Sequence, residues 1–232
     1  MPKPFRNPKP PFTGKGDRPR KGALWAAGTV SRRSLLIGLA AALALPARAA
    51  PPGPKDADQI ARIQAYLNSI QTLQSRFEQV SDDGGVDYGT IYIERPGRMR
   101  IVYDPPVPIL IVATGDQIYY YDSKLQNVSR TTLDDTPAWF LLRDHIQLGG
   151  DVTVTNFEKA ADTLRVTVRE TKNSNLGEVT IVLSDQPLTL RQWTVLDAQH
   201  RTVTVTLQDA KFGVALNPNL FYWTDPRPSG SY

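Results

Sequence analysis

The sequence predicts a mainly-β protein: an incomplete antiparallel barrel of about ten to eleven strands, with helices as a lid over an apolar cavity. Three observations support this fold class. Short segments that alternate apolar and polar residues fill most of the chain, Gly- and Pro-containing turns separate them, and long helical patterns are scarce. Such strands pair antiparallel, and this many twisted strands tend to curl or close.

The predicted strands alternate aliphatic residues with Thr, Arg or Gln. This alternation is typical of strands that have one buried and one solvated face. Turns at 95–97, 104–106 and 114–116 combine Pro, Gly and Asp, which interrupt regular structure. The strands are expected at 90–94, 99–103, 109–113, 117–121, 127–131, 152–155, 164–168, 179–183, 188–196 and 202–207.

Two helices are expected. Over 56–80, apolar residues that include Ile63, Leu67 and Ile70 recur at spacings of three and four, which places them on one helix face. The second helix, 138–142, follows a Thr-Pro pair suited to a cap and a first helical position. These helices would cover the concave face of the sheet and leave an apolar binding cavity. A filled core without a cavity would fit the same composition.

The first 49 residues are expected to be a signal peptide. A basic region that ends in Arg32-Arg33 precedes a short apolar run, and Ala47-Arg48-Ala49 then gives a small-x-small cleavage site. The Arg pair before two leucines resembles a twin-arginine export signal, although the general secretory route remains open. We expect a linker at 50–57 and one domain at 58–228, located in the periplasm.

The charge distribution argues against nucleic-acid binding. The whole chain has a net charge of +4, but residues 1–49 carry ten basic residues and one acidic residue. Residues 50–232 carry 17 basic and 22 acidic residues, a net charge of −5. The basic character therefore belongs to the predicted leader rather than to the folded domain.

The residue types also exclude several chemistries. The chain has no Cys and only two His, which leaves no disulfide, thiolate site or His-rich metal centre. No G-x-S-x-G, S-x-x-K, H-E-x-x-H or phosphate-loop motif occurs. We therefore expect no enzymatic activity, no metal and no cofactor.

A series of short motifs occurs in a fixed order along the chain. They are Phe77-Glu78-Gln79, a strand from Gly89 that ends in Arg95-Pro96, an aromatic strand that ends at Tyr103 before Pro105, Gly115 before Tyr121-Asp122, Thr136-Pro137 before Leu141-Leu142, and Leu220-Phe221 with Pro226. Each motif is weak alone, but their order resembles the periplasmic outer-membrane lipoprotein carrier family (LolA-type) over roughly 58–228. The missing Cys separates the chain from the related receptor, which is lipid-anchored at the outer membrane.

The resemblance implies a carrier rather than an enzyme. Members of this family take acylated lipoproteins from an inner-membrane lipoprotein-releasing transporter complex and give them to an outer-membrane acceptor, where one is present. The resemblance also implies that Arg95, with Pro96, closes the lid by reaching backbone carbonyls of the helices. The chain is expected to act as a monomer.

Candidates for the acyl cavity or lid come from both helices and strands. The helical candidates are Ile63, Leu67, Ile70, Trp139, Leu141 and Leu142, and the strand candidates are Met99, Ile101 and Ile111. Alternation alone does not say which strand face is concave. The alternative function is a periplasmic carrier of another lipid or hydrophobic small molecule on the same fold.

Overall fold

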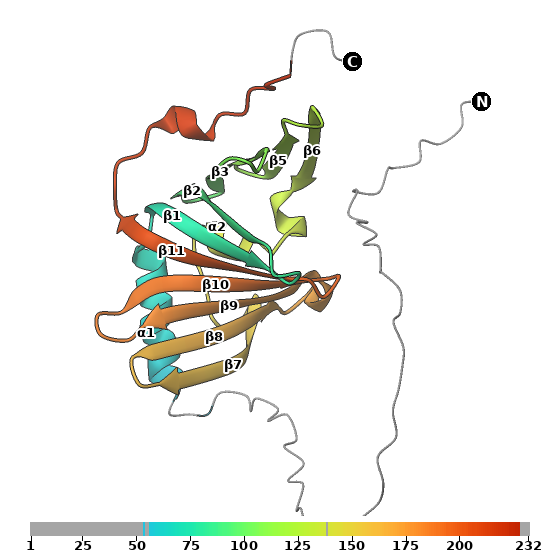
Figure 1. Cartoon of the computed structure of the whole chain (residues 1–232). Coiled ribbons are helices and arrows are strands. Elements are labelled where there is room, and N and C mark those ends of the chain that lie inside the picture. The colour runs from blue at the N-terminus through green and yellow to red at the C-terminus, as the bar shows by residue number, and fades with distance from the viewer. Residues whose placement is uncertain (1–52, 54–55, 138, 228–232) are drawn as a thin grey trace, which may run out of the picture. The chain divides into compact units, whose positions relative to one another are not determined.

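The computed structural model describes residues 53, 56–137 and 139–227. Eleven strands form one antiparallel sheet in the order β6-β5-β4-β3-β2-β1-β11-β10-β9-β8-β7. The strands are β1 (Thr72–Ser81), β2 (Val86–Glu94), β3 (Arg98–Tyr103), β4 (Ile109–Thr114), β5 (Gln117–Asp122), β6 (Asn127–Thr132), β7 (Val152–Ala160), β8 (Thr163–Glu170), β9 (Gly177–Ser184), β10 (Thr189–Asp197) and β11 (Thr202–Phe212). The sheet bends, with helices α1 (Ala57–Ser69) and α2 (Trp139–Leu142) on one side (Figure 1).

The prediction of a mainly-β fold with about ten to eleven antiparallel strands is confirmed. Every strand expected from alternation is present. The sheet consists of two meanders, β1–β6 and β7–β11, which are joined where β1 pairs with β11. In the described part of the chain, β6 and β7 are the two edges and do not pair with each other, so the sheet is open.

The prediction of one helix over 56–80 is wrong in its second half. Helix α1 ends at Ser69, where Ile70 has extended backbone angles, and β1 begins at Thr72. Leu73 and Phe77 are four residues apart, so they share a face in a helix and also in a strand. In β1 the buried residues are Leu73, Ser75 and Phe77, a period of two. Because Ser75 is polar, the spacing of apolar residues alone did not reveal this alternation.

The predicted leader, 1–49, and most of the predicted linker lie outside the described residues. Gly53, Asp56 and Ala57 are described, and α1 begins at Ala57. The second predicted helix corresponds to α2, although its first expected residue, Ala138, lies outside the described residues. No helix in the described ranges is long and apolar enough to cross a membrane.

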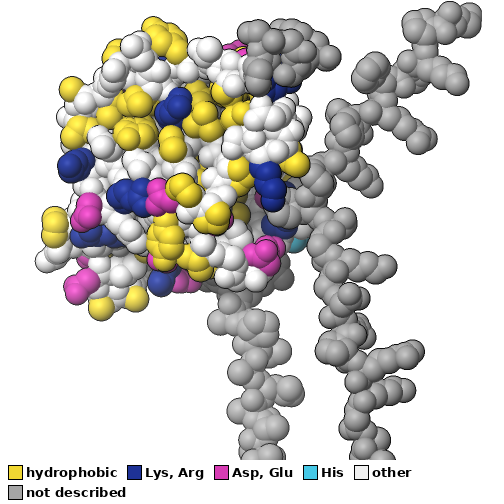
Figure 2. All heavy atoms as spheres, turned by 45° about the horizontal axis from the view of Figure 1, so that its top comes forward, with side chains coloured by type: hydrophobic (Ala, Val, Ile, Leu, Met, Phe, Trp, Pro, Cys, Tyr) yellow, Lys and Arg dark blue, Asp and Glu magenta, His cyan; other side chains and the backbone are white. Residues whose placement is uncertain are grey.

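The C-terminal segment, 213–227, packs on the outer face of β3 to β5. Phe221 is buried beneath the guanidinium of Arg98, which lies 5.9 Å from the ring centroid. Trp223 stacks on Tyr119 with 4.7 Å between ring centroids, and Arg100 Nη1 donates to the Leu220 carbonyl at 3.2 Å. Figure 2 brings this side of the molecule forward and shows hydrophobic and basic side chains gathered on it.

A buried carboxylate attaches α1 to the other end of the sheet. Asp185, in the β9–β10 turn, is 2.5 Å from Arg62 Nη1 and 2.9 Å from Lys159 Nζ. Arg62 Nη2 also donates to the Asp185 carbonyl at 2.7 Å. Hydrogen bonds from Arg62, and then from Lys159, hold the pKa of the Asp185 carboxyl below its usual range. This cluster therefore stabilises the docking of α1 while the carboxyl is ionised.

Asp185→Asn should lower the free energy of unfolding at pH 7 because it leaves Arg62 and Lys159 without a counter-charge. A carboxyl with a depressed folded pKa contributes stability above its unfolded pKa of about 3.9 and loses it as the pH falls through the folded pKa. Urea unfolding of both proteins at successively lower pH should therefore show their stabilities converging.

Asp104→Asn is the matched control, because Asp104 forms an exposed ion pair with Arg76. Exposed pairs contribute little to stability, so this variant should change the urea midpoint only slightly. A loss in Asp185→Asn that is equal to the control, or that persists at low pH, would contradict the role given to Asp185.

Candidate functional site

A cavity of about 310 Å³ lies between α2 and the inner faces of strands from both meanders. Its volume is at the lower end of the range of ligand pockets. The lining residues are almost all apolar. They are Phe77, Gln79, Ile91, Ile93, Met99, Ile101, Tyr103, Ile111, Ile118, Thr136, Pro137, Leu141, Leu142, Trp193, Val195, Val203 and Val205.

Strand register places the apolar residues of β2, β3 and β4 in rows. Ile91, Ile101 and Ile111 lie directly opposite one another on adjacent strands. Met99 lies two residues before Ile101, so it points to the same face. This arrangement resolves the question that alternation left open: Met99, Ile101 and Ile111 face the cavity.

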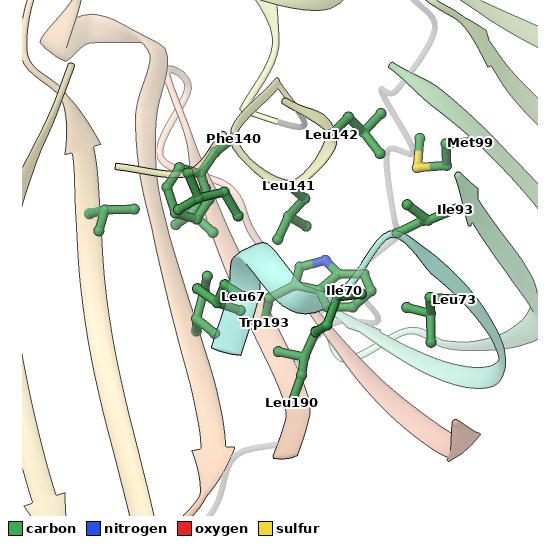
Figure 3. Packing of buried hydrophobic residues seen from close by; sticks show 14 of the residues in the cluster. Leu67, Ile70, Leu73, Ile93, Met99, Phe140, Leu141, Leu142, Leu190 and Trp193 are labelled. Atoms are coloured by element: carbon green, nitrogen blue, oxygen red, sulfur yellow. The ribbon is translucent and has the colours of Figure 1, made fainter. Parts of the chain in front are cut away.

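The predicted helical candidates divide into two groups. Leu141 and Leu142 of α2 line the cavity, whereas the other four do not. Figure 3 shows Leu67 and Ile70 packed near Trp193 and Leu190. The four that do not line it are Ile63, Leu67 and Ile70, which are buried in the core, and Trp139, which lies edge-to-face with Phe140 and under the Arg143 guanidinium.

Sequence reasoning missed the contribution of the C-terminal meander. Trp193 and Val195 of β10, and Val203 and Val205 of β11, line the cavity opposite β2 to β4. Their alternation predicted strands, but only the pairing of β1 with β11 brings them next to the first meander. That pairing joins residues more than 120 positions apart, for which a single sequence has no local signal.

Arg95 lies in the β2–β3 turn and is buried, with 7 % of its surface exposed. Its Nε donates to the Leu141 carbonyl at 2.8 Å, and its Nη1 donates to the Leu67 carbonyl at 2.6 Å. Both acceptors lie in the last turn of a helix, where the i to i−4 hydrogen bonds end and the helix dipole is negative. The Leu67 carbonyl also accepts from the Ile70 amide at 3.3 Å. The guanidinium therefore caps α1 and α2 together.

No carboxylate of the described residues forms an ion pair with Arg95. Burial lowers the pKa of the Arg95 guanidinium to about 10, so it remains charged at neutral pH. A buried charge without a counter-charge is costly, and here only the helix carbonyls and dipoles offset that cost.

Backbone contacts complete the join between the β2–β3 turn and α2. Gly97 N donates to the Leu142 carbonyl at 2.8 Å, and its own carbonyl accepts from Gly115 N at 3.0 Å. Gly97 has φ +73°, and a Cβ there would lie 2.6 Å from the Gly115 oxygen, so only glycine fits. Pro96 is exposed in the same turn.

Helix α1 is held separately by polar side chains. Asn68 forms a paired contact with Ile146: its Nδ2 donates to the carbonyl at 2.9 Å, and its Oδ1 accepts from the amide at 2.8 Å. Gln64 Oε1 accepts from Leu148 N at 2.7 Å, and the Tyr66 hydroxyl accepts from Leu190 N at 3.0 Å. These bonds fix α1 to the loop after α2 and to β10.

The described residues that line the cavity are uncharged. They include no His, Lys, Arg, Asp or Glu, and their polar groups are Gln79, Tyr103, Thr136 and the Trp193 indole. The described residues also contain no cluster of three or more His, Asp or Glu that could hold a metal ion. The arrangement is suited to an uncharged, mostly apolar ligand.

Sequence comparison shows the family. A family model described as outer membrane lipoprotein carrier protein LolA matches residues 68–224. The chain belongs to the LolA family.

Relatives extend across the same region. An outer-membrane lipoprotein carrier protein of Nitrosomonas europaea is 26 % identical over 184 residues, which is 75 % of this chain and 89 % of the relative. The outer-membrane lipoprotein carrier protein of Azotobacter vinelandii is 33 % identical over 116 residues, which is 46 % of this chain and 56 % of the relative. The crystal structure of a LolA superfamily protein from Nitrosomonas europaea aligns with a TM-score of 0.41 at 9 % identity, covering 70 % of this chain and 97 % of that one.

In this LolA-family chain, Asn68→Ala should lower the free energy of unfolding by about 1–3 kcal/mol. The substitution leaves the partly buried amide and carbonyl of Ile146 without their partner. It should also raise hydrogen exchange in 143–150, because that loop loses its attachment to α1.

Ser69→Ala is the control for this variant. The Ser69 hydroxyl bonds only the Tyr66 carbonyl of its own helix and is exposed, so its loss should change stability by less than about 0.5 kcal/mol. Equal urea midpoints for the two variants, or unchanged exchange in the loop, would show that Asn68 does not anchor α1.

Proposed function

We propose that this chain is a periplasmic chaperone that binds the acyl chains of lipoproteins and carries them between membranes. The observation that supports this most directly is the apolar cavity lined by strands of both meanders and by α2, in a chain of the LolA family. In this proposal the incomplete barrel is the container and the helices form its lid. Residues 1–49 would be removed as an export signal.

The need for such a container follows from the cost of hydrating acyl chains. Each methylene exposed to water costs about 0.8 kcal/mol, so a palmitoyl chain costs on the order of 12 kcal/mol. A carrier in an aqueous compartment must cover these chains and still release them. The cavity of about 310 Å³ would hold part of the cargo in the closed form, and lid movement would admit the rest.

Arg95 is the proposed latch of the lid, with Pro96 restricting the backbone beside it. Bonds from a charged group to carbonyls contribute about 1.5–3 kcal/mol each, and water can replace them when the guanidinium leaves its buried position. Entry of acyl chains would separate Arg95 from Leu67 and Leu141, and cargo release would restore both bonds. Closure and cargo binding would then compete.

The proposed cargo follows the names of the relatives, and the proposed donor and recipient follow from the resemblance of the sequence to the lipoprotein carrier family. Acylated lipoproteins would be the cargo, an inner-membrane lipoprotein-releasing transporter complex the donor, and an outer-membrane acceptor, where present, the recipient. The chain would act as a monomer, without a cofactor, without enzymatic activity and without binding nucleic acid.

The cargo can be identified by mass spectrometry of the material that co-purifies with the chain from the periplasm. Acylated lipoprotein should be present at a near-stoichiometric level. Recovery of phospholipid or another hydrophobic molecule alone would reject the lipoprotein proposal and favour the alternative carrier.

Arg95→Leu should still fold, because removing the buried charge offsets part of the loss of its two bonds to helix carbonyls, but it should stall the transfer of bound lipoprotein to an acceptor. Because the variant cannot re-form the two Arg95 bonds that compete with bound cargo, the rate of cargo release should fall by more than about tenfold. Stability is measured by urea unfolding, and release by transfer of a fluorescent lipopeptide to acceptor vesicles.

Arg201→Leu is the control, since Arg201 is an exposed arginine of the β10–β11 turn whose side chain pairs with Asp197. It should transfer cargo at the wild-type rate. Normal transfer by Arg95→Leu would reject the latch.

A further inference from the structure

The Trp193 indole, which lines the cavity, has a hydrogen-bond donor without a partner among the described residues. Trp193 of β10 is buried, with 6 % of its surface exposed, and lines the cavity. Its indole Nε1–H has no hydrogen-bond partner among the described residues, although buried indoles normally have one. Among the described residues, the buried side-chain atoms that are inaccessible to solvent and have no hydrogen-bond partner are Glu94 Oε2 and Arg143 Nη1. Trp193 Nε1 is not one of them, so it is accessible to solvent. Because Trp193 lines the cavity, its nitrogen borders the open space there.

The orientation of the ring is fixed by its surroundings. Trp193 lies between Ile181 and Val205 on the neighbouring strands. Figure 3 shows Ile70 beside the ring and the nitrogen on the edge that faces Leu141 of α2. The N–H is thus directed at the space beneath α2, where Leu141 also lines the cavity.

A second donor comes from a polar pair on β1 and β3. The Tyr103 hydroxyl donates to Gln79 Oε1 at 2.8 Å, and both side chains line the cavity. Burial raises the pKa of the Tyr103 hydroxyl to about 12, so it keeps its proton and remains the donor. This leaves the Gln79 Nε2 amide without a partner among the described residues.

We propose that Trp193 Nε1 and Gln79 Nε2 donate hydrogen bonds to the carbonyl oxygens of fatty-acyl esters or amides. The apolar lining accepts hydrocarbon, while the two N–H groups require acceptors. An ester or amide carbonyl at the head of an acyl chain supplies an acceptor without a charge. A free fatty acid would bring a carboxylate into a lining that contains no cation.

This inference rests on the proposed function, because it takes the ligand to be an acyl chain. It adds that the cavity recognises the carbonyl of the ester or amide bond at the head of the acyl chain, so that acyl esters bind more tightly than bare hydrocarbon. A lipoprotein and a phospholipid share this chemistry, and the test must distinguish the two sources.

The test compares three ligands by titration calorimetry: a diacylglyceryl-cysteine peptide, its dialkyl ether analogue without the ester carbonyls, and a diacyl phospholipid. The wild-type chain should bind the ester-linked peptide more tightly than the ether. Trp193→Phe should bind the ester about fivefold more weakly, the scale of one neutral hydrogen bond, and leave ether binding unchanged. Trp223→Phe, on the outer face against Tyr119, is the control and should match wild type.

A spectroscopic signature separates hydrogen bonding from packing. The indole N–H resonance of Trp193, assigned by its absence in Trp193→Phe, should move downfield with the ester-linked peptide and not with the ether. Gln79→Leu should likewise weaken ester binding selectively.

Each outcome has a defined consequence. Equal affinity of the wild type for ester and ether, or equal losses on both in Trp193→Phe, would overturn the inference and leave the carrier proposal standing. Binding of neither acyl peptide nor phospholipid would reject both. Ester discrimination with phospholipid but no binding of the peptide would support the carbonyl contact and reject lipoprotein as cargo.

Discussion

The pairing of β1 with β11 is the contact on which the cavity depends. Leu73 to Ser81 align with Phe212 to Val203 across the middle of the sheet, with one irregularity after Gln74. This pairing joins two meanders that are otherwise built from neighbouring strands. Without it, the isoleucines of the first meander and Trp193 of the second would not share a cavity. The joined sheet bends (Figure 1), and Leu141 and Leu142 of α2 line the cavity together with its strands.

The helices are attached to this sheet by contacts of different kinds. Asp185, Asn68 and Tyr66 hold α1 through bonds to the sheet and to the loop at Ile146. The end of α2 is held by backbone groups of the β2–β3 turn and by Arg95, whose charge has helix carbonyls as its partners. In the proposed function, the attachment of α2 is the exchangeable one, because a carrier of acyl chains must cover the chains and then give them up.

The sequence predicted the strands well because alternation is a local property of each strand. The same reasoning failed in β1. Leu73 and Phe77 are four residues apart, and this spacing places two residues on one face of a helix and also on one face of a strand. It named Arg95 only through a family motif, because contacts with Leu67 and Leu141 arise from the tertiary fold. Trp193 was missed for a similar reason. Its sequence context predicts a strand, whereas its place in the cavity, with an N–H that has no partner among the described residues, depends on how both meanders and α2 come together.

The central claim is that this chain moves lipoproteins away from the inner membrane. The most direct test is to deplete the chain in the bacterium that encodes it and to separate the two membranes on a density gradient. Lipoproteins normally found in the outer membrane should then accumulate in the inner membrane, and a copy of the gene should restore their distribution. An unchanged lipoprotein distribution in depleted cells would contradict the claim.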